Sequence, residues 1–172
     1  QLETLRLPPG FNISVVTVIP KARQLAVSQN GTVAVGTRNQ NVSIITGILT
    51  GRPRKKIIAT GLNSPNGVAW YGTDLYVAEI DRLLLFRDLE NRLNEVVEPE
   101  EIARFPNEIH HGLKYIKINP YTNRIFVPIG APCNSCYKPL PFATIYSMNL
   151  DGSNRTVFAK GIRNTVGFDV CI

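Results

Sequence analysis

One sequence pattern recurs along the chain, and it limits the possible folds more than any other feature. The stretches QLAVSQNGTVAVGT, GVAWYGTDLYVAEI and LKYIKINPYTNRIFVPIG begin at Gln24, Gly67 and Leu113 and align on their turns. Their starts are 43 and 46 residues apart, within the roughly 40–50 residue period of a propeller blade. A fourth copy, TVGFDV, follows Asn164. The repeat therefore predicts a β-propeller with about three blades and the first strand of a fourth.

The blade-like units are expected at residues 10–60, 61–105 and 106–160, with a fourth beginning in 161–172. Within them, short runs of alternating apolar residues are separated by Gly, Asn, Asp or Pro turns, which is typical of an all-β chain. Only DLENRLNEVV, at 88–97, has a helical pattern. It is short and acidic, so we expect one turn of helix within a loop.

Composition agrees with a folded chain and excludes some partners. The 172 residues are 44% hydrophobic and 19% charged, as expected for one globular domain. No apolar run approaches the roughly 20 residues of a membrane helix. The net charge of +6 favours anions, but the basic residues are scattered apart from RPRKK at 52–56. We interpret that run as a solvated loop and predict no nucleic-acid partner.

An arc of three blades raises the question of closure, because known propellers close with four to eight blades. An open arc would expose two broad apolar sheet faces and unpaired strands. We therefore expect the chain to be the first half of a larger protein. The alternatives are closure by self-association and a truncated product that folds poorly.

Glycosylation motifs and cysteines indicate the compartment. Four Asn-x-Ser/Thr triplets, at Asn12, Asn30, Asn41 and Asn154, are potential glycan acceptors and together favour a secreted protein. Cys133 and Cys136 form CNSC, which is compatible with a short-loop disulfide, a redox pair or half of a metal site. We favour the disulfide, which leaves Cys171 either unpaired or paired with a segment that is absent.

Several blocks resemble a known family. They are ARQLAVSQNGTVAVGTRN, LNSPNGVAWYGTDLYVAEIDRLLLF, HHGLKYIKINPYTNRIFVPIGAPCNSC, ATIYSMNLDGSNRTVFAKGIRN and TVGFDV. Together they are similar to the N-terminal half of the soluble pyrroloquinoline-quinone (PQQ) glucose/sorbosone dehydrogenases, and the resemblance runs from LPPGF at position 7 almost to the end. The HG…VPIGAPCNSC and GIRN blocks are its most specific parts. PNGVAW…LYVAE is less specific, because six-bladed lactonases and strictosidine-synthase-like proteins use it too.

The resemblance implies a six-bladed propeller that binds PQQ and Ca²⁺ over its central channel and oxidises an aldose or related sugar or alcohol, passing electrons to an acceptor. It assigns the catalytic base to His111 and cofactor contacts to Arg163 and Asn164. Asn63 and Asn66 are both candidates for a further amide contact. In the family the calcium ligands and further basic cofactor contacts come from later blades, so we predict no metal ligand in this chain. We also expect that the chain alone does not hold PQQ as the family does, and is inactive by itself, unless those blades are supplied in trans.

The residue types suit these roles on chemical grounds. PQQ carries carboxylates and an ortho-quinone, which an Arg fork and an Asn amide can bind. Histidine is the usual base near neutral pH for removing a hydroxyl proton as hydride leaves the carbon. Arg23 and Arg38, near channel-side strand ends, could assist anion binding. His110 is expected to orient its neighbour or face solvent.

Two other functions remain open on the sequence alone. One is a calcium-dependent lactonase-like hydrolase, for which Glu79 and Asn66 are the plausible ligands here. The other is a secreted propeller without catalysis that binds partners through its loops. No phosphate-binding Gly-rich loop, Ser-His-Asp signature or calcium-loop carboxylate cluster is present.

Overall fold

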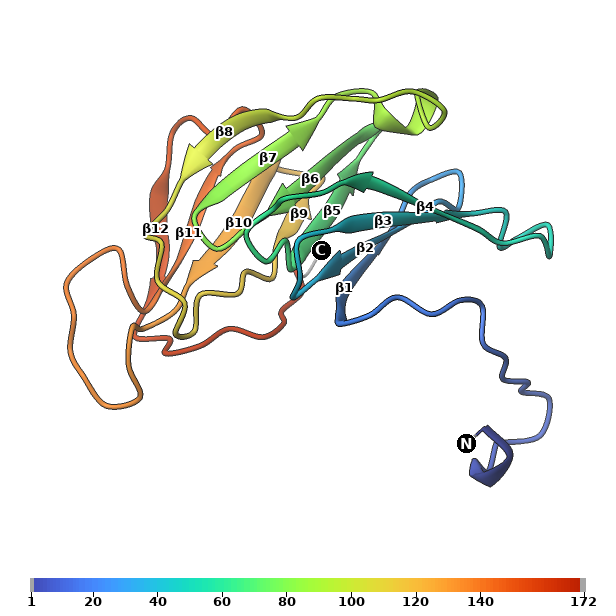
Figure 1. Ribbon diagram of the computed structural model, residues 1–172. Helices are drawn as coiled ribbons and strands as arrows, with labels where there is room; N and C mark the ends of the chain where they lie inside the picture. Colours follow the sequence, from blue (N-terminus) through green and yellow to red (C-terminus); the bar gives the residue numbers. More distant parts are fainter. Residues whose placement is uncertain (1, 171–172) are drawn as a thin grey trace.

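The computed structural model describes residues 2–170 and contains three antiparallel four-stranded sheets, each with its strands in sequence order (Figure 1). The all-β prediction is therefore confirmed. The first sheet comprises β1 (Ala22–Val27), β2 (Val33–Thr37), β3 (Val42–Thr46) and β4 (Arg54–Ala59). The second comprises β5 (Gly67–Tyr71), β6 (Asp74–Ala78), β7 (Arg82–Phe86) and β8 (Glu100–Arg104). The third comprises β9 (Lys117–Asn119), β10 (Arg124–Ile129), β11 (Thr144–Asn149) and β12 (Thr156–Lys160).

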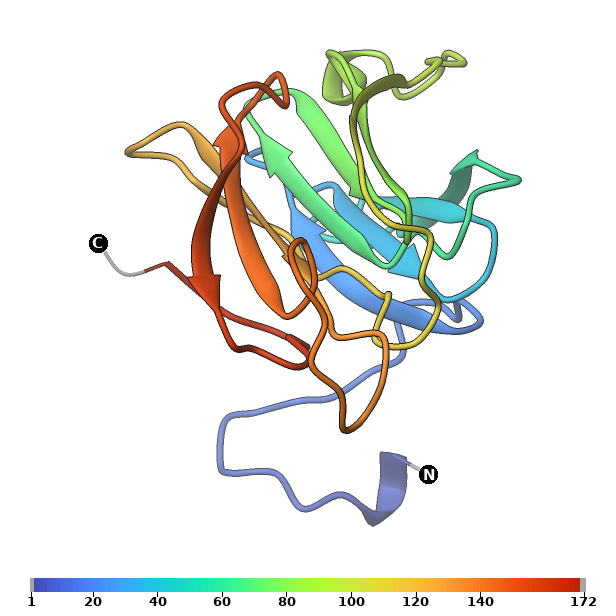
Figure 2. The ribbon, with the colours of Figure 1, turned by 90° about the vertical axis from the view of Figure 1, so that its left-hand side faces the viewer.

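The sheets meet along their first strands. β1 lies against β5, and β5 lies against β9, so the second sheet stands between the other two (Figure 1). Figure 2, turned by 90°, shows the third sheet from its outer side with the N-terminal segment leading away from the sheets. Each predicted unit contains one sheet, whereas the number of blades in a closed ring stays a prediction.

Alternate side chains of the middle sheet point to its two faces, and each face contributes to a different hydrophobic core. Leu75 and Val77 of β6 pack toward the first sheet, whereas Tyr76 and Ala78 pack toward the third. Because both faces are buried, the strand is apolar from Leu75 to Ala78, and each large buried side chain contributes about 1.5–3 kcal/mol. Burial, followed by the nearby carboxylate of Asp74, raises the pKa of Tyr76 to about 12.

The outer faces of the first and third sheets carry exposed apolar side chains. Leu25 and Val27 of β1 are 60% and 66% exposed, and Phe158 of β12 is 66% exposed. These side chains are the ones that a neighbouring sheet would cover. Two predictions for what covers these side chains stay open: a second copy of this chain, or further sheets of a longer protein.

Two local predictions have different outcomes. The acidic stretch 88–97 contains the expected helical turn, the 3₁₀ helix η2 (Leu89–Asn91). The interpretation of RPRKK as a loop is wrong, because its last three residues begin β4, pairing Arg54 with Thr46 and Lys56 with Ile44. An edge strand is paired on one side only, so it can keep its charged side chains in solvent.

The segment after β12 follows a bent path across the end of the third sheet. Its start is held by Ile162, whose N–H donates to Ala143 O at 3.1 Å, and its later part contacts Tyr115 and Lys117 through Phe168 and Asp169. Residues 161–170 form no strand, since no neighbouring ladder within the described chain pairs with them. The fourth unit thus stays a prediction, and Cys171 lies outside the described residues.

The described residues include one further short helix, η1 (Leu2–Thr4), at the start of the N-terminal segment. Within residues 2–170 no helix has the length and apolar character needed to cross a membrane.

Candidate functional site

A cleft of about 440 Å³ opens where the first strands of the three sheets begin. The start of β1, the residues before β5 and β9 and the segment after β12 all contribute to it. Its polar lining residues are Arg23, Gln24, Arg38, Asn66, His111, Tyr115, Asn164 and Thr165. We call it the first cleft. Its volume lies within the roughly 300–1,000 Å³ typical of small-molecule sites.

Gln24 fixes this end of the three sheets to one another. Its side-chain oxygen accepts from the backbone N–H groups of Val68, at 3.2 Å, and Ile116, at 3.1 Å, and its amide nitrogen donates to Ile116 O at 2.8 Å. The residue is 8% exposed. This role was not predicted from the sequence, although a polar residue next to the apolar residues of RQLAV is the signal that could have indicated it.

Asn66 continues the inter-sheet bonding and also reaches the cleft. Its side-chain nitrogen donates to Lys114 O at 2.6 Å, while its buried Oδ1 atom has no hydrogen-bond partner among the described residues. Asn66 is 7% exposed and lines the first cleft. A buried acceptor without a partner is costly, so Oδ1 is suited to a hydrogen-bond donor on a ligand.

Lys114 supports the backbone that follows the predicted base. Its ammonium group donates to Gly112 O at 2.7 Å and lies 5.8 Å from the centre of the Phe105 ring. The side chain is almost fully buried, and this burial lowers the pKa of Lys114 to about 8 against the opposing attraction of Asp81.

His111 lies on the wall of the first cleft in a left-handed backbone conformation, with φ of 54°. Its Nδ1 atom is 2.9 Å from Ala131 O. A carbonyl only accepts, so Nδ1 carries the proton in the neutral ring, and Nε2 keeps a lone pair. Gly130 permits this close approach, because a Cβ there would lie 2.4 Å from His111 O and 2.6 Å from His111 Cβ.

The first cleft has a strong charge bias. Arg23 and Arg38 line it, neither forms an ion pair within residues 2–170, and none of the lining residues is acidic. Unpaired guanidinium groups in a concave surface attract anions and can bind a carboxylate with two parallel hydrogen bonds. The cleft is therefore suited to a ligand with negative charge.

The predicted Arg163–Asn164 pair is divided between two clefts. Asn164 shares the first cleft with His111. Arg163 instead lines a neighbouring cleft of about 550 Å³, and its Nη1 atom donates to Asn134 O at 3.1 Å. We call this neighbour the second cleft. The two side chains of the pair therefore lie in different clefts.

The predicted disulfide is present and lines the second cleft. Cys133 and Cys136 are bonded, with their Cα atoms 5.9 Å apart. Within the loop that they close, Asn134 Oδ1 lies 3.1 Å from Nε2 of the exposed His110. The disulfide loop therefore contacts the residue beside His111.

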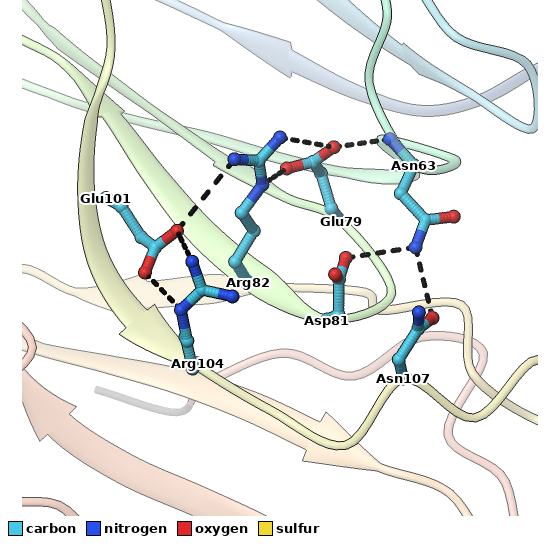
Figure 3. Close-up of polar contacts among 7 residues, drawn as sticks. All are labelled: Asn63, Glu79, Asp81, Arg82, Glu101, Arg104 and Asn107. Carbon is cyan, nitrogen blue, oxygen red and sulfur yellow. Dashed lines mark hydrogen bonds and ion pairs between the residues drawn. The ribbon is translucent and has the colours of Figure 1, made fainter.

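Asn63 and Glu79 belong to a separate polar network at the end of the second sheet (Figure 3). Glu79 is fully buried, is paired with Arg82 and accepts the backbone N–H of Asn63. Asn63 donates to Asp81 at 3.0 Å and to Asn107 at 3.2 Å. Neither Asn63 nor Glu79 lines the first cleft. Of the two amide candidates, only Asn66 is placed beside His111.

The potential glycan acceptors are spread over the surface. Asn12, Asn30 and Asn154 are exposed, whereas Asn41 is half-buried in the turn between β2 and β3. Their glycosylation and a secreted location stay predictions. Within residues 2–170, no group of three or more His, Cys, Asp or Glu side chains is placed to hold a metal ion.

Sequence comparison finds a distant relative. No family model matches the chain. An uncharacterized protein of Borreliella burgdorferi is 27% identical over 180 residues, an alignment that covers 96% of this chain and 46% of that protein. The chain thus spans about half the length of this relative.

Solved structures show what the fold resembles. The PQQ domain of pyranose dehydrogenase from Coprinopsis cinerea aligns with a TM-score of 0.72 at 16% identity, over 86% of this chain and 40% of that domain. A Trichoderma reesei protein of carbohydrate-active enzyme family AA12 gives 0.70 at 13% identity, over 88% and 43%. A putative glucose dehydrogenase from Thermus thermophilus gives 0.61 at 15% identity, over 83% and 52%. The three sheets thus share the fold of PQQ-type propeller domains over about half of their length.

Proposed function

We propose that this chain forms part of a PQQ-dependent oxidoreductase acting on an aldose or a related alcohol, with the cofactor in the first cleft. The observation that carries the proposal is that His111, Asn66 and Asn164 line the same cleft as Arg23 and Arg38, which form no ion pair within the described residues. No acidic residue lines this cleft. Support also comes from the fold shared with PQQ-type domains.

The residues of the first cleft fit the cofactor chemically. PQQ is an anionic tricarboxylate whose ortho-quinone, when bound, would accept a hydride, and with it two electrons, from the alcohol carbon. Arg23 and Arg38 would hold its carboxylates, and the amide of Asn164 would orient it. Oδ1 of Asn66, which is buried without a partner, would accept a hydrogen bond from the cofactor or substrate.

His111 would remove the hydroxyl proton of the substrate. Ala131 O holds Nδ1–H, so Nε2 is the atom that accepts this proton as the carbonyl of the product forms. Gly130 and the Lys114–Gly112 hydrogen bond keep the backbone of His111 in place. Arg163 stays a predicted cofactor contact, and reaching the first cleft would require its side chain to leave Asn134.

Calcium, an electron acceptor and the remaining cofactor contacts are proposed to come from outside these residues. The lactonase alternative is less well supported, because the carboxylate of Glu79 is already engaged by Arg82 and by the backbone of Asn63. A binding propeller without catalysis is the outcome that the following experiment would favour if the proposal fails.

The test is calorimetric titration of the 172-residue chain with PQQ in the presence of Ca²⁺. We expect saturable binding that weakens about tenfold or more when Arg23→Gln and Arg38→Gln are combined. The matched control is Arg52→Gln with Arg54→Gln, which removes the same charge from the exposed edge near β4 and should leave the affinity unchanged.

The catalytic role has a separate readout. If the chain oxidises an aldose with an artificial electron acceptor, His111→Gln should lower kcat by about 10²–10⁴-fold while PQQ still binds. If both double-arginine variants lost the same affinity, the cofactor assignment would be contradicted. Absence of PQQ binding would contradict a cofactor site formed by this chain alone. Unchanged turnover in His111→Gln would contradict the role of His111.

A further inference from the structure

The second cleft is a separate concave surface at the end of the third sheet. It lies where β10 leads into the long loop that precedes β11 and where β12 ends (Figure 1). Its volume of about 550 Å³ exceeds that of the first cleft. Apart from Arg163, none of the residues that line the second cleft has a role in the proposed oxidation.

Three cationic side chains line the second cleft without a counter-charge. They are Lys138, Lys160 and Arg163. No acidic residue lines the cleft, and within residues 2–170 none of the three forms an ion pair. Arg163 is held by the carbonyl of Asn134 alone. Several like charges kept together without partners are unfavourable, so the cleft is suited to a carboxylate or another compact anion.

The same cleft offers groups that suit a sugar ring. Tyr137, 95% exposed, and the half-buried Phe142 supply flat aromatic faces, which can cover the C–H face of a pyranose. Ser135 and Asn134 add hydroxyl and amide groups that can bond to sugar hydroxyls. Aromatic, polar and cationic groups thus occur together in one concavity.

The wall of the second cleft is constrained and adjoins the first cleft. The Cys133–Cys136 bond closes the loop, and Asn134 contacts His110 on one side and Arg163 on the other. His111 directly follows His110. A ligand that fills the second cleft therefore lies next to the wall that carries His111.

From these features we infer that the second cleft binds an acidic saccharide, with the carboxylate of a uronic acid unit held by Lys138, Lys160 and Arg163. The aromatic rings of Tyr137 and Phe142 contact the sugar ring. The inference concerns binding alone, so it does not depend on PQQ or on catalysis by His111. A nucleic acid fits less well, because it requires an extended basic track rather than one pocket.

The experiment compares trigalacturonate with its fully methyl-esterified form by isothermal titration calorimetry at roughly 0.15 M salt. The two ligands share rings and hydroxyls and differ in charge. Lys138→Gln combined with Lys160→Gln is the test variant, and Arg52→Gln with Arg54→Gln is the matched control. All four side chains are exposed, so the folds should be intact, which circular dichroism checks.

We expect saturable binding of trigalacturonate, with the methyl ester about tenfold weaker or more. The lysine variant should bind trigalacturonate more weakly than the parent by a similar factor, and its affinity for the methyl ester should change little. The control variant should bind both ligands as the parent does. Equal affinity for acid and ester, an unaffected lysine variant, a control that loses as much as the test variant, or no binding at all would each overturn the inference. None of these results bears on PQQ binding in the first cleft.

Discussion

The two clefts lie side by side but are built in different ways. The first cleft draws its walls from all three sheets, and buried amides of Gln24 and Asn66 tie those walls together. The second is formed by one loop and the strand ends of one sheet, and its constraint is a local disulfide. Sites on rigid elements hold their geometry better than sites on loops, whereas loops tolerate variation. We therefore expect the first cleft to keep its geometry and the second cleft to tolerate more variation.

The largest expected effect comes from removing the inter-sheet amide. Gln24→Leu leaves the N–H groups of Val68 and Ile116 and the carbonyl of Ile116 buried without partners. At about 1–3 kcal/mol for each such group, we expect a loss of about 3 kcal/mol or more in the free energy of unfolding. Urea denaturation measures it.

Gln40→Leu, at an exposed position, is the control for that change and should cost little. In Gln24→Leu, the affinity of the first cleft for PQQ should fall more than the affinity of the second cleft for trigalacturonate. Equal loss at the two clefts would mean that they are not built independently.

A pH titration tests the backbone behind His111. The pKa of Lys114 is lowered to about 8 in the folded chain from roughly 10.4 when unfolded, so the unfolded state binds more protons between these values. The free energy of unfolding should therefore rise as pH increases through this window, by about 2 kcal/mol between pH 7 and 10.

Lys114→Met should remove this rise, and the difference between the parent and the variant cancels the titration of other groups. Urea denaturation at pH 7 and pH 10 measures it. Parallel pH profiles for the two proteins would show that Lys114 is not buried as described.

The smallest expected effect is on the second cleft. Replacing Cys133 and Cys136 by serine opens a loop of only a few residues, so the stability loss should be about 2 kcal/mol or less. Affinity for trigalacturonate should fall several-fold because the loop is less constrained, whereas PQQ affinity should hold. Dithiothreitol should reproduce the effect on the parent and leave the serine variant unchanged. If the serine variant lost more affinity for PQQ than for trigalacturonate, the disulfide would constrain the first cleft more than the second, contrary to our expectation.

The sequence predicted the sheets better than their contacts. Strands such as those containing Leu75–Val77 could be read from their apolar runs, since burial on both faces leaves a plain local signal. The edge strand β4 was missed because its exposed basic residues carry no alternation. Local pattern also gives no information on partners 92 residues away, so the role of Gln24 was not predicted.

For the candidate site, the family resemblance indicated His111 and Asn164, and the structure brings these two to one cleft. It did not separate Asn63 from Asn66, because the choice depends on which amide joins the Glu79 network. Nor could it show that Arg163 faces the neighbouring cleft, since that depends on the path of residues 161–166 over the disulfide loop.

The hydrogen bonds of Gln24 have a consequence for how the chain is made. Its amide side chain bonds to Ile116, 92 residues later in the sequence. At roughly 5–20 residues per second of synthesis, about 5–20 s pass before that partner exists. During this interval the amide of Gln24 is bonded to water instead of Ile116, and the face of the first sheet that carries it is not yet closed by the other sheets. The ribosome-bound chain is thus most open to chaperones, and to pairing with other nascent chains, until the third sheet emerges.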